Sequence, residues 1–119
     1  MPNTSGFVNA RQMNLHYLAH GADFGAANAI EYERMADAFW AVPKPAHVHE
    51  CMRKSGDIVR YDPHTAAYSV VDAKGVIRTF FKPVPCVALP TGERTTARRS
   101  GRCHDHPNNL VYFQTECKR

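Results

Sequence analysis

Two histidines, His16 and His20, stand four residues apart near the start of this chain of 119 residues. Residues i and i+4 of a helix share one face, so a helix here places the two imidazoles side by side. Gly21 follows directly, and glycine commonly ends a helix. Imidazole has an unperturbed pKa of about 6.5 and can accept or donate a proton near neutral pH. The pair is therefore a candidate for general acid–base chemistry at a helix end.

The same spacing allows two other roles for the pair. One imidazole can cap the helix or pack in the core while the other stays in solvent. An HxxxH pair also suits zinc, which needs two further ligands. The nearest candidates for those ligands are Cys103, His104, Asp105, His106 and Cys117. The histidines alone leave the three roles open.

Three side chains suited to a phosphate lie in the middle of the chain. Arg60 can hold a phosphate and stabilise a pentacovalent transition state, and Lys82 is long enough to reach one. Thr79 needs a polar partner such as His20 if it points inward from a half-buried strand. With the histidines, these residues form a set suited to metal-free cleavage of a phosphodiester. The ordinary alternatives are an ion pair between Arg60 and Asp62 and a solvated Lys82.

Alternation along the last strand limits how many of these groups can face one site. In a regular strand Arg78 and Lys82 face one way, and Thr79 faces the other with Ile77 and Phe81. A β-bulge would re-aim one of them, and otherwise only one face contributes. We expect Ile77 and Phe81 to enter the core on the helix side.

The charge of the chain favours an anionic partner. The formal net charge is +4 and the pI is near 9.0, and arginines crowd the last quarter of the chain. Aromatic side chains that stack on unpaired bases and arginines that bind phosphates are typical of RNA recognition. The residues that we expect to contact RNA are Tyr61, Arg78, Arg98, Arg99 and Arg102. A packed tyrosine and a solvated arginine loop are the alternatives.

Composition and length favour one globular domain over residues 1–119. Hydrophobic residues make up 44% and charged residues 22%, which excludes global disorder. No apolar run approaches the roughly 20 residues that span a bilayer, so we expect no membrane insertion, and the N-terminus lacks the pattern of a signal peptide. The four cysteines allow three full pairings, so a reduced cytosolic enzyme and a disulfide-bearing exported protein both stay open.

Periodicity predicts two helices followed by an antiparallel sheet, an α+β fold. The first helix covers residues 9–20, and the second begins near Asn28, whose side chain can cap it, and ends before Pro43. Short connections between the strands require antiparallel neighbours. The expected strands are residues 48–53, 57–62, 67–72 and 76–82.

The two ends of the chain carry weaker signals. Residues 1–8 are expected to be a frayed lead-in. Residues 87–89 fit a short edge strand, and residues 91–108 fit a polar, basic loop. Residues 109–113 fit a last helical turn or strand docked through Leu110, Tyr112 and Phe113.

An ordered set of segments resembles a known group of proteins. The segments are HYLAHGADF at 16–24, EYE at 31–33, MA at 35–36, GDIVRYDP at 56–63 and GVIRTFFKP at 75–83. They resemble the C-terminal toxin domains of bacterial polymorphic and contact-dependent inhibition systems. The chain looks more specifically like the barnase–EndoU–colicin–RelE (BECR) superfamily of metal-independent ribonucleases. Residues 109–113 and Cys117 match more loosely.

The resemblance implies helices packed on an antiparallel sheet, an RNA target that is often tRNA, and a dedicated immunity protein. It also implies no cofactor or metal, and delivery of the domain, as part of a larger secreted toxin, into a target-cell cytoplasm where it acts. Carried over by position, the catalytic residues are His20, His16, Arg60, Thr79 and Lys82. We therefore expect an RNA endonuclease in which attack of the 2′-hydroxyl leaves a 2′,3′-cyclic phosphate. The alternatives are a non-catalytic nucleic-acid-binding or protein-interaction module with a basic tail, and a zinc-stabilised domain.

Overall fold

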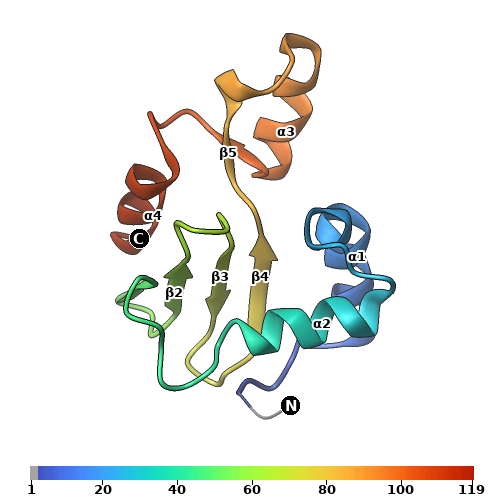
Figure 1. The fold of residues 1–119 in the computed structure, drawn as a ribbon, viewed down its shortest axis with the longest axis vertical. Coiled ribbons are helices and arrows are strands. Elements are labelled where there is room, and N and C mark those ends of the chain that lie inside the picture. The colour runs from blue at the N-terminus through green and yellow to red at the C-terminus, as the bar shows by residue number, and fades with distance from the viewer. Residues whose placement is uncertain (1–2) are drawn as a thin grey trace.

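A four-stranded antiparallel sheet forms the centre of the computed structural model, which describes residues 3–119 (Figure 1). The strands lie in chain order and pair as a meander, as predicted. Each lies within one residue of its predicted bounds at both ends, because the turns between them are short and polar. The strands are β1 (His49–Met52), β2 (Ile58–Tyr61), β3 (Tyr68–Val71) and β4 (Ile77–Phe81).

Two helices precede the sheet, which confirms the predicted α+β layout. Helix α1 (Ala10–His20) begins after Asn9, and α2 (Ala29–Ala38) begins after Asn28. Each asparagine side chain accepts a hydrogen bond from a backbone N–H in the first turn of its helix, which satisfies a donor that the helix leaves unpaired. None of the helices in residues 3–119 has the length and apolar character that crossing a bilayer requires.

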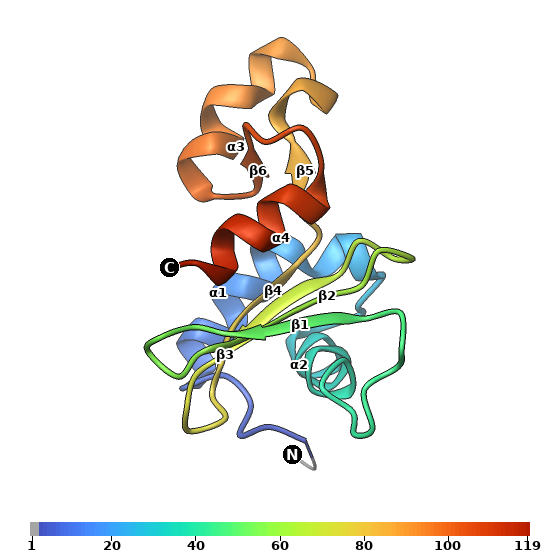
Figure 2. The same ribbon diagram turned by 90° about the vertical axis from the view of Figure 1, so that its left-hand side faces the viewer.

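Helix α2 buries its apolar stripe against one face of the sheet. Tyr32 and Ala36 are fully buried there, and the Tyr32 hydroxyl donates to the backbone oxygen of Phe80. Trp40 Nε1 donates to Ser69 Oγ at 2.9 Å, so the polar atom of this buried indole also has a partner. Burial of each large aromatic side chain contributes about 1.5–3 kcal/mol. Helix α2 covers this face of the sheet and lies below it in Figure 2.

The opposite face of the sheet packs against α4 (Asn109–Cys117) (Figure 2). Phe113 is buried against Val59, Val70 and neighbouring strand residues. A disulfide between Cys51 and Cys117 ties the end of α4 to β1. Residues 109–113, for which the sequence allowed a helical turn or a strand, are therefore part of a helix. Tyr112 and Phe113 dock this helix on the sheet, whereas Leu110 is 37% exposed.

A smaller unit follows β4, where two of our expectations were wrong. Residues 86–88 form the 3-10 helix η2 (Cys86–Ala88) instead of an edge strand, and the edge pairing is parallel, between β5 (Val84–Pro85) and β6 (Cys103–His104). Residues 91–108 are not one basic loop, because they contain η3 (Thr91–Glu93), α3 (Arg94–Ser100) and β6. The Cys86–Cys103 disulfide and the buried Ala97 hold this short, mostly polar segment together.

The segment before α1 is docked, which corrects the expectation of a frayed lead-in for residues 3–8. The buried carboxylate of Asp37 accepts hydrogen bonds from Thr4 N at 2.8 Å and Thr4 Oγ1 at 2.6 Å. Glu33 Oε2 accepts from the backbone N–H of Phe7, whose ring is buried. Two acidic residues beside the apolar stripe of α2 therefore anchor the segment. Residues 1–2 lie outside the described residues.

The end of α1 differs in detail from the expected glycine stop. Gly21 keeps right-handed helical angles, and the chain continues as η1 (Gly21–Phe24). The left-handed residue is Gly25, with φ of 67°. Position 21 still requires glycine, because a Cβ there would lie 2.5 Å from a ring carbon of Tyr17. The close packing of Tyr17 on Gly21 therefore sets where His20 stands beside β4.

Candidate active site

Two adjoining pockets that share Ser100 form a groove beside β4. Its first half is lined by Arg53, Asp57, Tyr68, Val70, Arg78, Thr79, Phe81, Ser100, Gly101, Tyr112, Glu116 and Arg119. Its second half, between the end of α1 and α3, is lined by Ala19, His20, Gly92, Glu93, Thr96, Ala97, Ser100 and Arg102. Ser100 lines both halves, and the ring of His20 lies 5.2 Å from that of Phe81 between centroids. We call the two halves together the arginine groove.

A β-bulge lets adjacent residues of β4 line this groove. Thr79 pairs with Val70 and Ile77 pairs with Val71, so Arg78 is the extra residue. Ile77 therefore packs in the core under α2, while Phe81 packs in the core under α4. Our expectation that Thr79 shares the face of Ile77 was wrong for this reason. Phe81 is buried, but on the face away from α2.

His20 is held as a neutral base beside the groove. Burial, the neighbouring His16 and Arg102 lower the pKa of His20 to about 4, although Asp23 opposes them. Burial also lowers the pKa of His16, whose ring centroid lies 6.0 Å from that of His20. The Nδ1 atoms of both rings are buried without a hydrogen-bond partner among residues 3–119. At neutral pH both imidazoles are therefore uncharged and can accept a proton.

The arginines of the groove differ in how far they are neutralised. Arg53 pairs with Asp57 and Glu116, and Arg119 pairs with Glu116 at 2.9 Å. Arg78 and Arg102 form no ion pair within the described part of the chain. An unpaired guanidinium can bind a phosphate with two parallel hydrogen bonds, so Arg78 and Arg102 supply anion-binding capacity.

The structure places Arg60 outside the groove, and its role as a phosphate ligand stays a prediction that this position does not support. Arg60 is buried on the α2 side, where Nε donates to Glu50 Oε1 at 2.6 Å. Nη1 donates to the backbone oxygens of Phe39 and Ala41, and the guanidinium lies 4.9 Å from the centre of the Trp40 ring. The strand register sets Glu50 opposite Arg60, and Glu50 is therefore its partner instead of Asp62.

Lys82 lines a pocket that adjoins the groove and shares Arg102 with it, whereas Tyr61 lies outside the groove. The Lys82 ammonium lies 5.2 Å from the centre of the Phe24 ring, and its side chain lines neighbouring hollows that include Asp23. Tyr61 is 6% exposed and packs against Phe113, so its ring is not free to stack on a base. The contact of Tyr61 with RNA stays a prediction that this packing does not support.

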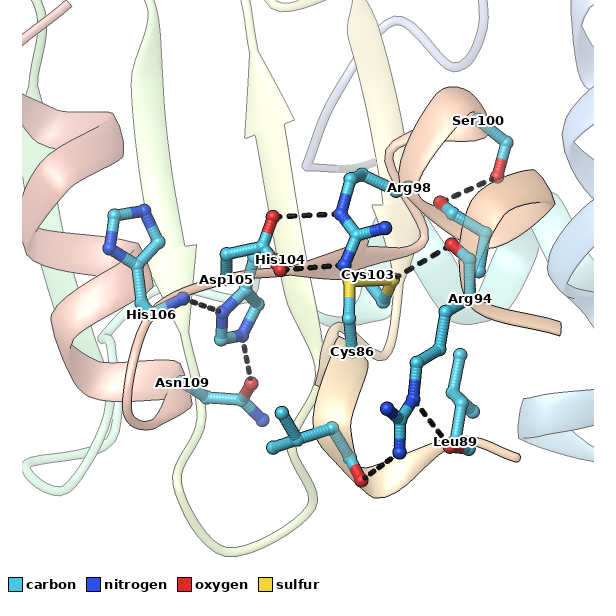
Figure 3. Close-up of a disulfide and its surroundings, with 12 residues drawn as sticks. Cys86, Leu89, Arg94, Arg98, Ser100, Cys103, His104, Asp105, His106 and Asn109 are labelled. Carbon is cyan, nitrogen blue, oxygen red and sulfur yellow. Dashed lines mark hydrogen bonds and ion pairs between the residues drawn. A yellow bond between two sulfur atoms is a disulfide. The ribbon is translucent and has the colours of Figure 1, made fainter. Parts of the chain in front are cut away.

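Helix α3 carries the two remaining arginines that we expected to bind RNA. Arg98 forms two hydrogen bonds of 2.8 Å with the carboxylate of Asp105, and both side chains are exposed (Figure 3). Arg99 is exposed on the same helix. Neither residue lines the groove.

The disulfide unit around α3 forms one wall of the groove. Arg94 donates from Nε to the Leu89 backbone oxygen at 2.9 Å, next to the Cys86–Cys103 bond (Figure 3). His104 Nδ1 accepts from the His106 backbone N–H, and His104 Nε2 lies 2.8 Å from Asn109 Oδ1. Both ring nitrogens of His104 are therefore used within the fold.

The zinc site that we considered for His16 and His20 does not form. Cys103 and Cys117 are both in disulfides, so neither is a thiolate ligand. Among residues 3–119, a different group brings possible metal ligands together: His47, Asp62 and His64. No sequence motif marks this group, because His47 and the β2–β3 turn meet only through strand pairing.

Sequence analysis also missed the contributions of Arg53, Arg119 and Ser100 to the groove. Arg53 and Arg119 meet because α4 lies across the sheet, where Arg53 Nε donates to the Glu116 backbone oxygen at 2.8 Å. The only signal for this contact in the sequence was a possible bond between Cys51 and Cys117, one of the pairings that the sequence leaves open.

Comparisons with known proteins give distant likenesses to solved structures only. No protein-family model and no curated protein matches the chain. Among solved structures, the chain is similar to a ribonuclease from Escherichia coli complexed with its inhibitor protein. The match has 18% identity and a TM-score of 0.45, and it covers 76% of this chain and 98% of that chain.

Proposed function

We propose that the chain is an endoribonuclease that cleaves RNA by attack of a 2′-hydroxyl on the adjacent phosphate, without a metal ion. One observation carries the proposal: the uncharged imidazole of His20 stands at the same groove as the unpaired guanidinium of Arg102. A base and a cation side by side supply the two things that this reaction needs, removal of a proton and stabilisation of a more negative phosphorus centre.

In the proposed reaction His20 takes the proton of the 2′-hydroxyl. The freed oxygen forms a bond to phosphorus, and the bond from phosphorus to the 5′-oxygen breaks, which leaves a 2′,3′-cyclic phosphate. The departing 5′-oxygen takes a proton from water, and the imidazolium of His20 releases its proton to the solvent. A bound phosphate helps the first step, because its negative charge favours the protonated form of His20.

Arg102, Arg78 and Thr79 are proposed to hold the phosphate. Arg102 lies close enough to His20 to depress its pKa, so it would face the same phosphate. Thr79 and Arg78 come from the bulge in β4 and line the adjoining half of the groove. His16 has a positioning role: its ring lies between Phe7 and His20 and helps to keep His20 uncharged.

The finer biological assignments are proposals as well. We propose an RNA target of the tRNA class and a cognate immunity protein that covers the groove, as the resemblance of the sequence to BECR toxin domains implies. The two disulfides support passage through an oxidising compartment, as expected for a domain that is exported within a larger toxin and acts in the cytoplasm of a target cell.

The test is incubation of the purified chain with total bacterial RNA in EDTA, followed by analysis of the fragment ends. We expect discrete fragments with 2′,3′-cyclic phosphate ends. Arg102→Gln should lower kcat/KM about 10²- to 10³-fold, as loss of one transition-state contact does. Arg34→Gln, which changes an exposed arginine of α2 far from the groove, is the matched control and should keep the parent rate.

Two outcomes would contradict the proposal. Intact RNA with a folded sample is one. The other is salt-sensitive RNA binding without cleavage, which would favour the non-catalytic binding module instead.

A further inference from the structure

A cluster of three possible metal ligands lies away from the arginine groove. His47 comes from the segment between α2 and β1, and Asp62 and His64 come from the turn between β2 and β3. One ligand atom from each residue lies within 4.8 Å of the others. None of the three lines the groove, so the proposed ribonuclease reaction does not account for their meeting.

The local geometry brings two imidazoles and one carboxylate against one another. The rings of His47 and His64 are stacked, with centroids 3.9 Å apart and planes 5° apart. Asp62 Oδ1 lies 3.3 Å from His47 Nε2 and also accepts the His64 backbone N–H at 2.8 Å. The exposed fraction is 38% for the His47 side chain and 15% for that of Asp62, so a solvent ion has access while the carboxylate stays fixed.

The backbone that carries the ligands is ordered by its own hydrogen bonds. Asp62 donates its N–H to Ala67 O at 2.9 Å and accepts from Ala66 N at 2.8 Å, which closes the turn on both sides of His64. On the other segment, Val48 is buried, and its N–H donates to Pro45 O at 3.1 Å. Fixed ligand positions lower the ordering cost of capturing an ion.

We propose that His47, Asp62 and His64 bind one divalent transition-metal ion of the zinc class. Two imidazoles and a carboxylate form a common three-ligand set for Zn²⁺, and imidazole also suits Cu²⁺, Ni²⁺ and Fe²⁺. Mg²⁺ and Ca²⁺ prefer all-oxygen ligand sets and should not compete. Water would complete the coordination on the exposed side. The ion would link the segment before β1 to the β2–β3 turn.

The test is calorimetric titration of tag-free, chelator-stripped protein with ZnCl₂ and, separately, with MgCl₂. We expect one Zn²⁺ per chain and no uptake of Mg²⁺. His47→Gln and His64→Gln should each weaken Zn²⁺ binding about 10- to 100-fold or more, since loss of a direct ligand costs at least as much as loss of an outer-shell partner. The matched control His106→Gln removes an imidazole outside the cluster and should leave the binding unchanged.

Co²⁺ gives a second, spectroscopic measurement that does not rely on the heat of binding. Visible d–d absorption of the Co²⁺-loaded parent should disappear in His64→Gln, while near-ultraviolet circular dichroism shows that the variant is folded. Absence of Zn²⁺ uptake would overturn the proposal, and so would uptake that His106→Gln abolishes and His64→Gln does not. RNA cleavage in EDTA is scored separately, so failure of either proposal leaves the other standing.

Discussion

The chain holds two histidine pairs that differ in nearly everything except their side chains. His16 and His20 lie on a helix, half-buried, with Arg102 near His20, and the pKa of both is lowered. His47 and His64 are exposed, come from different segments and share the carboxylate of Asp62. The first environment favours an uncharged base beside a phosphate, and the second favours a cation held between two imidazoles. Surroundings, more than residue type, therefore assign the chemistry.

The two regions are also held together by different means. The arginine groove depends on α3 and α4: Cys51–Cys117 ties α4 to β1, and Cys86–Cys103 joins the two segments that flank α3. The metal-ligand cluster rests on strand pairing and turn hydrogen bonds alone. Removal of a disulfide should therefore damage the groove and spare the cluster.

The largest expected effect on stability is loss of the Cys51–Cys117 bond. Its sequence separation of 66 residues corresponds to about 4 kcal/mol of unfolding free energy, against about 3 kcal/mol for the 17-residue separation of Cys86–Cys103. Urea unfolding of the two double Cys→Ala variants measures both losses. A loss below about 1 kcal/mol in the first variant would contradict the role of this bond in holding α4.

The next effect on stability concerns Arg60, which was predicted at the site and is buried in the structure. Arg60→Met leaves Glu50 and two backbone oxygens without their donor, so we expect a loss of about 2–3 kcal/mol in unfolding free energy. RNA cleavage by the fraction that stays folded should be unchanged. A folded variant with the stability of the parent and greatly reduced cleavage would return Arg60 to the active site.

A third effect is the pH dependence of stability that His20 causes. The folded pKa of His20, about 4, is below the unfolded value of about 6.5, so the unfolded chain binds more protons between these values. Stability is therefore present above pH 6.5 and is lost as the pH falls toward 4, by at most about 1.4 kcal/mol per pH unit for this group. His20→Gln should flatten the loss, whereas His49→Gln, an exposed change on β1, should not.

The same pKa sets the acid limit of activity. kcat/KM reports the free enzyme, so its acidic limb should fall near pH 4 instead of near pH 6.5. A limb near pH 6.5 that His20→Gln removes would show that His20 is more solvated than the structure has it.

The sequence predicted those parts of the fold that depend on local patterns. The apolar spacing of Tyr32, Met35 and Ala36 and the cap at Asn28 defined α2, and short polar turns defined the sheet. Helix α3 was missed because it is short and polar and owes its order to the Cys86–Cys103 bond. The docked residues 3–8 were missed because their partners, Glu33 and Asp37, lie far along the chain.

The candidate site was also predicted only in part, because some of its features depend on long-range contacts. His20, Thr79, Arg78 and Arg102 were identified as candidates and lie along one groove. Arg60 was misplaced because strand register, which pairs it with Glu50, is set by turns and packing that the residue types do not show. Tyr61 was misplaced because α4 covers its ring.

The most direct test of the central claim compares two histidine variants in EDTA. Single-turnover cleavage of one RNA substrate is measured for the parent, His20→Gln and His49→Gln, each checked for folding by circular dichroism. We predict a rate about 10²- to 10⁴-fold lower for His20→Gln, the usual cost of losing a general base, and the parent rate for His49→Gln. Equal rates for all three proteins would show that His20 is not the base and would contradict the account.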